Sequence, residues 1–373
     1  MKHALIHLCF LLAIPFIASG CAQLLQTDNA LFLEDLAAGD SVSRIKERTP
    51  TPTVQKVEYE NSKRQYQADL YQPRETALAG IVLIPGVAQN GREDPRLVMF
   101  ANTLARFRFV VLVPEIPNLR DLKIRAEDSQ TIKDAFEYLV SQNDLSPQAK
   151  IGMGAFSYAV GPAILAALDP AISDKVGFIL GVGGYYDIEK TITYFTTGQF
   201  RYQNEWHYLE PNEYGKWVFV LSNLERLTDP IDQMNFREIA WRKMNNPNAI
   251  IDDLTVDLSP EAFTILMLLE NQDPELAPEH ILSLPAPIRT DISSLDLSSK
   301  DLNHLKARLI LLHGTDDNII PYTESIALAN AVAEDQAELY LIDGLAHVDI
   351  HPQKLDKWVM LSAVSALLEM REM

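Results

Sequence analysis

Ser157 lies where a serine could act as a nucleophile, at the predicted corner between a strand and a helix. Residues 150–154 are predicted to form a short buried strand, and residues 163–168 are apolar, alanine-rich and helical in character. The residues two positions before and after the serine are Ala155 and Ala159, and a sharp turn needs small side chains there. A serine hydroxyl becomes a nucleophile once a base removes its proton. The alternative is an ordinary serine that caps the helix.

A carboxylate and an imidazole follow in the second half of the chain, each just after a predicted strand. The strand predicted at 308–312 precedes Asp317, and the strand predicted at 339–342 precedes His347. Functional side chains gather at the carboxyl edge of a parallel sheet. The residues between Asp317 and His347 have room for one helix and one strand, which is the spacing of neighbouring parallel strands.

The rest of the chain predicts a mostly parallel sheet flanked by helices. Buried strands are predicted at 81–84, 109–113 and 176–182, and helices at 96–107 and 127–141. Strands that alternate with helices in this way indicate βαβ units. Two segments of alternating polarity, 54–59 and 65–71, predict an antiparallel hairpin before them.

Residues 190–300 break the alternation and predict a helical insertion after the sixth strand. Helical patterns occur at 213–226, 231–244 and 260–271, and no segment has a convincing strand pattern. Aromatic residues are dense in its first part. They either shape a pocket or simply pack the insertion against the core.

These segments together resemble the α/β-hydrolase superfamily, which includes serine esterases and dienelactone hydrolases. The resemblance covers residues 54–373 and is based on 81–91, 150–165, 308–322 and 339–347. The order serine, acid, histidine is that of the superfamily, and the usual Gly-x-Ser-x-Gly motif has alanine here in place of both glycines.

The resemblance implies an α/β-hydrolase fold with a core at 54–189 and 301–373 and a helical cap at 190–300. It implies that Ser157 is the nucleophile, that His347 is the base and then the acid, and that Asp317 orients the imidazole.

The same resemblance assigns an oxyanion hole. The backbone N–H of Tyr158 and that of Val87 match the two donor positions. The donor loop often contains His-Gly in the superfamily, and Pro85 replaces that histidine here.

Several residues offer alternatives to this assignment. Asp187 is the second candidate for the acid, His351 is the second candidate for the base, and His313 is expected to be structural. His347, Asp349 and His351 are metal-ligand types at alternate positions, but no further histidine lies nearby in sequence. We therefore expect neither a metal nor a cofactor.

The expected reaction is hydrolysis of a carboxylic ester through an acyl-enzyme. A peptidase or thioesterase of the same fold is one alternative. Another alternative is a lipoprotein that uses the fold as a binding module with an inactive site. It is suggested by the alanines that replace both glycines around Ser157 and by Pro85, which replaces the histidine of the donor loop.

Composition narrows the class of protein. The 373 residues are 47% hydrophobic and 22% charged, as in a soluble globular protein. The net charge of −19, without any basic run, argues against a nucleic-acid partner. The only cysteines, Cys9 and Cys21, precede the folded part, which excludes cysteine catalysis and a disulfide within it.

Residues 1–20 have the pattern of a lipoprotein-type signal peptide. Lys2 precedes an apolar stretch at 4–18, and the ending Ile-Ala-Ser-Gly-Cys21 resembles the lipobox of bacterial lipoproteins. The resemblance implies that Cys21 carries a lipid anchor in the cell envelope. Residues 21–53 are predicted to be a tether with a short helix at 31–36. Gln23 favours the outer membrane if the cell has one, and a periplasmic or secreted protein is the alternative.

Overall fold

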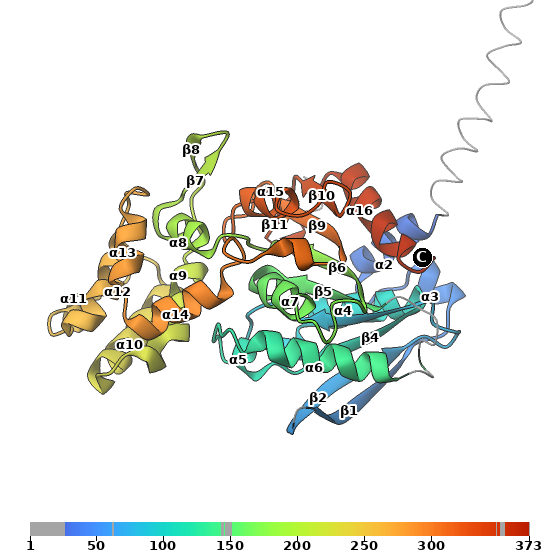
Figure 1. The fold of residues 1–373 in the computed structure, drawn as a ribbon. Coiled ribbons are helices and arrows are strands. Elements are labelled where there is room, and N and C mark those ends of the chain that lie inside the picture. The colour runs from blue at the N-terminus through green and yellow to red at the C-terminus, as the bar shows by residue number, and fades with distance from the viewer. Residues whose placement is uncertain are drawn as a thin grey trace, which may run out of the picture.

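An eight-stranded sheet forms the centre of the computed structural model (Figure 1). The structure describes residues 27–61, 63–142, 145, 151–347, 349–350 and 355–372. The predicted signal peptide and Cys21 lie outside these ranges. The strands are β1 (Thr53–Asn61), β2 (Arg64–Gln72), β3 (Ala79–Ile84), β4 (Phe109–Pro114), β5 (Ile151–Phe156), β6 (Val176–Val182), β9 (Arg308–Gly314) and β10 (Ala337–Ile342).

The strand order is β1-β2-β4-β3-β5-β6-β9-β10. Strand β2 pairs antiparallel with β1 and β4, and the pairings from β4 to β10 are parallel. This is the arrangement of the α/β-hydrolase fold, so the predicted fold class is confirmed. Strands β3 and β4 are buried throughout, as expected for parallel strands covered on both faces.

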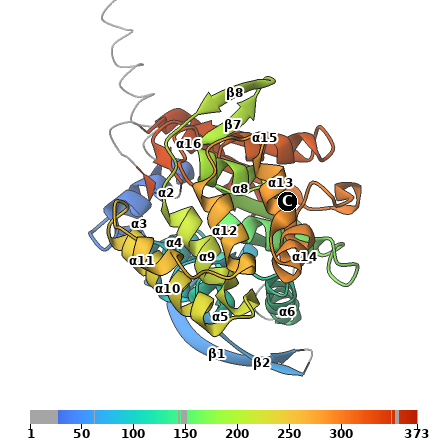
Figure 2. The same cartoon turned by 90° about the vertical axis from the view of Figure 1, so that its left-hand side faces the viewer.

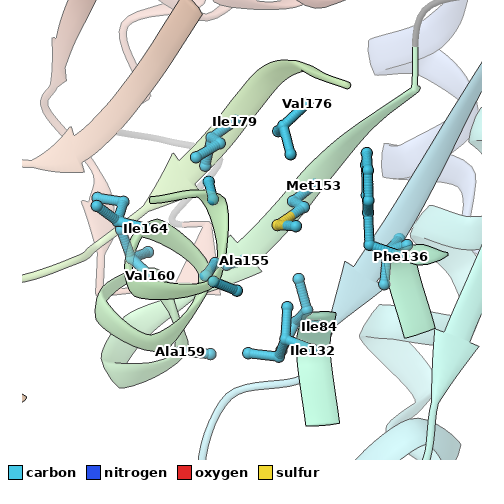
Figure 3. Close-up of a cluster of buried hydrophobic side chains, with 14 of the residues drawn as sticks. Ile84, Ile132, Phe136, Met153, Ala155, Ala159, Val160, Ile164, Val176 and Ile179 are labelled. Atoms are coloured by element: carbon cyan, nitrogen blue, oxygen red, sulfur yellow. The ribbon is translucent and has the colours of Figure 1, made fainter. Parts of the chain in front are cut away.

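Helices cover both faces of the sheet. One face packs against α6 (Asp128–Ser141), α7 (Val160–Ala167) and α15 (Thr323–Asn330), and the other against α2 (Asp28–Ala38), α4 (Pro95–Arg106) and α16 (Lys357–Glu369). Figure 3 shows part of the first layer, where Ile132 and Phe136 of α6 and Ile164 of α7 surround Met153 of β5. Apolar packing on both sides therefore fixes the ends of the central strands, where the candidate residues lie.

Residues 21–53, which were expected to be a tether, contain two helices that pack against the core. Helices α2 and α3 (Arg44–Arg48) lie within residues 21–53, and Leu31, Phe32 and Ile45 are buried in the core. The buried carboxylate of Asp35 accepts hydrogen bonds from Ser43 and from Thr103 of α4. The sequence indicated only a short helix here, because the burial of α2 depends on distant residues of α4 and α16.

A helical segment, residues 188–295, lies between β6 and β9 and projects from one end of the sheet (Figures 1 and 2). Its helices are α8 (Ile188–Thr197), α9 (Tyr214–Asn223), α10 (Pro230–Asn245), α11 (Asp252–Thr255), α12 (Pro260–Glu270), α13 (Ala277–Ser283) and α14 (Ala286–Leu295). It has a hydrophobic cluster of its own, which includes Phe236, Ile265 and Ile288. The patterns at 213–226, 231–244 and 260–271 correspond to α9, α10 and α12.

The segment also contains two strands that the sequence analysis missed. Strands β7 (Gln199–Tyr202) and β8 (Glu205–Tyr208) form a hairpin around Gln203 and Asn204, which both have positive φ. Such a two-residue turn usually carries glycine, and its absence here left no turn signal in the sequence.

The remaining short elements are α5 (Pro117–Arg120), β11 (Leu345–Ala346) and β12 (Asp349–Ile350), and β11 pairs antiparallel with β12. Within the described ranges, no helix has both the length and the apolar character needed to cross a membrane.

Candidate active site

Ser157 occupies a strained corner directly after β5. Its φ is +57°, a left-handed conformation that costs a non-glycine residue roughly 1–3 kcal/mol. A single 3-10 turn, Ser157–Ala159, leads into α7. Ala155 and Ala159 are fully buried, so the small side chains fit the tight packing expected around the turn. Pro162 is the third residue of α7, where its missing N–H removes no helical hydrogen bond.

The structure brings Ser157, His347 and Asp317 together from the loops after three strands. His347 Nε2 lies 2.8 Å from Ser157 Oγ, and His347 Nδ1 lies 2.8 Å from Asp317 Oδ2. Both distances allow a hydrogen bond, which is the geometry of a nucleophile, a base and a group that orients the base. His347 also has a positive φ of +54°, so two of the three residues have left-handed backbones.

Asp317 is only 1% exposed and every side of its carboxylate is occupied. Oδ1 accepts the backbone N–H groups of Ile319 at 2.8 Å and Ile320 at 3.0 Å, and Oδ2 faces His347 and His313. Burial alone would raise the pKa of Asp317. The charge of His347 and the hydrogen bonds from both histidines outweigh burial and hold the pKa below its ordinary value, so the group stays a carboxylate.

His313 is a buried neighbour of Asp317. Its Nε2 lies 3.2 Å from Asp317 Oδ2 and 3.0 Å from the carbonyl oxygen of Ile320, so these two acceptors place a proton on Nε2. Its Nδ1 lies 2.7 Å from Ser325 Oγ and can accept a hydrogen bond from that hydroxyl. The sequence indicated a structural histidine here, but gave no sign that it contacts the candidate acid directly.

The two expected oxyanion donors lie beside Ser157. Tyr158 follows it at the start of the helical turn, where a backbone N–H has no intrahelical acceptor. The Val87 loop lies against this corner, because a Cβ on Gly86 would come within 3.7 Å of Ser157 Cβ. Among the described residues the Val87 N–H has no protein acceptor, and Tyr214 donates its hydroxyl to the Val87 carbonyl oxygen at 3.1 Å.

The alternative residues lie elsewhere or outside the described ranges. The carboxylate of Asp187 caps α8 by accepting the Lys190 N–H, and it pairs with the Lys190 amine at 2.9 Å. His351 and the side chain of Asp349 lie outside the described residues. In the part of the chain that the structure describes, no three His, Cys, Asp or Glu side chains are grouped as a metal ion would need.

Glu324 is a buried carboxylate near the site that the sequence analysis missed. It accepts the backbone N–H of Tyr186 at 3.0 Å and that of Asp187 at 2.7 Å, and so ties α15 to the loop after β6. Burial raises its pKa to about 7. A glutamate in the first turn of a helix is ordinary, so the sequence carried no signal for this role.

Ser157 and His347 line a cavity of about 1410 Å³. Its walls come from the helical segment, from the ends of the strands, and from α2, α4 and α16. The candidate nucleophile is therefore accessible to a bound molecule.

Comparison with known proteins gives remote structural similarity alone. No protein-family model and no curated protein matches the sequence. Dienelactone hydrolase from Anabaena variabilis is similar at 13% identity and a TM-score of 0.47, covering 86% of this chain and 97% of that one. Est1E from Butyrivibrio proteoclasticus is similar at 12% identity and a TM-score of 0.47, with 85% and 99% covered. An acylaminoacyl peptidase from Pyrococcus horikoshii is similar at 12% identity and a TM-score of 0.48, covering 88% of this chain but 42% of the peptidase.

Proposed function

We propose that the chain is a serine hydrolase that cleaves carboxylic esters through an acyl-enzyme. The observation that supports this most is the continuous hydrogen-bond chain from Ser157 Oγ through both ring nitrogens of His347 to Asp317 Oδ2, with 2.8 Å at each step. A histidine held in this way has one nitrogen free to take the serine proton.

In the first half of the reaction, Ser157 Oγ attacks the ester carbonyl carbon while His347 Nε2 takes the hydroxyl proton. The carbonyl oxygen becomes an oxyanion, which the N–H groups of Tyr158 and Val87 stabilise. One such donor contributes roughly 3–4 kcal/mol. The imidazolium then gives the proton to the leaving alkoxide, the C–O bond breaks, and the acyl group stays on Ser157.

In the second half, water repeats the attack on the acyl-enzyme. His347 takes a proton from the water, a second oxyanion forms in the same place, and the proton returns to Ser157 Oγ as the carboxylic acid leaves. Asp317 stabilises the imidazolium in both halves, because its depressed pKa keeps it charged. Ile319 and Ile320 hold its other oxygen, which fixes the direction of the carboxylate.

Steady-state hydrolysis of 4-nitrophenyl butyrate by the full chain tests this function. We expect hydrolysis by the wild type and a loss of about 10⁴-fold or more in kcat for His347→Ala. The control is His304→Ala, since that side chain is exposed and hydrogen-bonded to neither Ser157 nor Asp317. Matched amide and thioester substrates distinguish an esterase from a peptidase or thioesterase. A folded wild type that cleaves none of the three would contradict the proposal and favour a binding module.

We also propose that Cys21 carries a lipid anchor, based on the signal-like sequence before it. Metabolic labelling with an alkyne-bearing fatty acid should mark the wild type and not Cys21→Ser. Equal labelling of both proteins would refute the anchor.

A further inference from the structure

The cavity at Ser157 extends in two directions. One part reaches the helical segment, where its lining includes Thr191, Phe195, Val218, Ser222, Asn223 and Asp291. The other part lies between the sheet and the helices α2, α4 and α16. We call this second part the acyl lobe, and its lining includes Phe32, Leu36, Leu97, Phe100, Met360 and Val364. Figure 1 shows the helical segment and the pair α2 and α16 on opposite sides of α7, which begins beside Ser157.

A row of aromatic rings connects Ser157 to the far end of the acyl lobe. Phe156, which precedes the serine, lies 5.9 Å from Phe100 of α4 between ring centroids, and Phe100 lies 6.0 Å from Phe32 of α2. Both pairs meet edge to face, the arrangement that aromatic rings prefer. The wall of the lobe is therefore continuous from the candidate nucleophile to α2.

The two parts of the cavity differ in polarity. The sheet contributes only apolar side chains to the acyl lobe, among them Leu180, Val182 and Leu312. The charged side chains that α2, α4 and α16 add to the lining are few, and those of α2 and α4 are in ion pairs: Glu34 with Arg44, and Arg96 with Asp94. A polar leaving group inside this lobe would give up hydrogen bonds to water without finding new ones. The part at the helical segment has hydroxyl, amide and carboxylate groups in its lining.

We propose that the acyl lobe binds a long unbranched acyl chain, so that the substrates are long-chain lipid esters. This inference rests on the proposed ester hydrolase. The leaving alcohol then occupies the more polar part of the cavity at the helical segment.

The size of the cavity favours a long chain over a short one. The two parts of the cavity together have a volume of about 1410 Å³, which exceeds the roughly 300–1,000 Å³ of a typical small-ligand pocket. An acetyl or butyryl group would leave most of the apolar wall uncovered. Each additional methylene removed from water can improve kcat/KM by up to roughly fourfold.

The dependence of the rate on chain length tests the proposal. The full chain is assayed with 4-nitrophenyl esters from acetate to palmitate, and with acetate esters of alcohols of increasing length. We expect kcat/KM to rise by about tenfold or more from butyrate to laurate, and to stay nearly constant in the alcohol series. A maximum at acetate or butyrate would overturn the inference, and so would a length preference in the alcohol series alone.

Two substitutions in α16 provide a matched pair. Leu361 and Val359 are both half-buried, but only Leu361 lines the cavity. We expect Leu361→Trp to lower the ratio of kcat/KM for laurate to that for butyrate by about tenfold or more. Val359→Trp should leave this ratio unchanged. Leu36→Trp in α2 obstructs the same lobe from another helix and guards against misfolding of the first variant.

The outcomes separate the inference from the function on which it rests. If both Leu361→Trp and Leu36→Trp keep the wild-type preference for laurate, the acyl chain does not bind in the acyl lobe. Continued hydrolysis of butyrate would show in that case that the proposed ester hydrolase still stands. Absence of hydrolysis in every ester series would overturn the esterase itself, and the inference with it.

Discussion

The sheet edge that carries Ser157 differs from the helical segment beside it in which side chains are buried and which are exposed. At the sheet edge, polar groups are buried and hydrogen-bonded to one another, as Asp317 and His313 are. The helical segment buries an apolar cluster of its own and leaves other large apolar side chains in solvent, including Ile231, Met234, Trp241, Ile250, Val256 and Phe263. The difference indicates that rigid, saturated polar contacts are concentrated where the proposed chemistry needs them.

Hydrogen bonds to backbone carbonyl groups join the helical segment to the loops that carry Val87 and Asp317. Tyr214 reaches the Val87 carbonyl oxygen at 3.1 Å, Tyr194 reaches that of Asp317 at 3.3 Å, and the Asn212 N–H reaches that of Asn318 at 2.7 Å. The helical segment thus supports the loops of the site and does not contribute a side chain to the Ser–His–Asp hydrogen-bond chain. Substitutions at the sheet edge should therefore have larger effects on activity than substitutions in the segment.

After the loss predicted above for His347→Ala, the largest effect is expected at the acid. Asp317→Asn should lower kcat by about 10⁴-fold, because an amide favours the wrong tautomer of His347. The matched control is Asp187→Asn, which alters the cap of α8 and the ion pair with Lys190 and should change kcat by less than about threefold. Ester hydrolysis with saturating substrate measures both. If Asp187→Asn is the damaging variant, the acid has been assigned to the wrong residue.

The next largest effect is expected in the hydrophobic core beneath the site, where a substitution changes the free energy of unfolding. Phe32→Ala in α2 should lower the free energy of unfolding by about 3–5 kcal/mol, because the ring is 1% exposed and leaves a cavity. Val42→Ala, at a side chain 75% exposed in the same N-terminal region, should change it by less than about 0.5 kcal/mol. Urea unfolding provides the comparison. Equal stability of both variants would mean that residues 21–53 contribute no core packing and act only as a tether.

Glu324 predicts a dependence of stability on pH. Its folded pKa of about 7 lies above the ordinary value of 4.5, so between these values the folded protein holds a proton that the unfolded chain has released. Stability should therefore fall as the pH rises from about 5 to 7, by roughly 3 kcal/mol from this group. Asp128, whose pKa burial also raises to about 7, contributes in the same direction.

Glu324→Gln separates the two contributions, because a glutamine oxygen can still accept the N–H groups of Tyr186 and Asp187. We expect the decline between pH 5 and 7 to shrink by about half. Urea unfolding at intervals of one pH unit measures it. An unchanged slope would mean that Glu324 is ionised in the folded protein throughout this range.

The smallest effect is expected where the two regions touch. Tyr214→Phe removes one hydrogen bond to the Val87 loop, and we expect kcat to fall by about two- to tenfold with no loss of stability beyond about 1.5 kcal/mol. Tyr208→Phe, at an exposed ring, is the control. A loss as large as that of Asp317→Asn would place the helical segment within the chemistry itself.

The sequence predicted the sheet and the three site residues because their signals are local. A buried strand followed by a short loop can be recognised within about ten residues, as at Ser157 and Asp317. The missed features depend on distant partners: Phe32 becomes a core residue through α4 and α16, and Glu324 through the loop after β6. The β7–β8 hairpin was missed because Gln203 and Asn204 adopt positive φ without a glycine.

Fluorophosphonate labelling of the full chain tests whether Ser157 is an activated nucleophile, because the probe reports an activated serine without assuming a substrate. We expect a single adduct, located on Ser157 by peptide mass spectrometry. Labelling should be absent in Ser157→Ala and slowed by orders of magnitude in His347→Ala, while His304→Ala labels like the wild type. A folded wild type that forms no adduct, or an adduct on another serine, would refute Ser157 as the nucleophile.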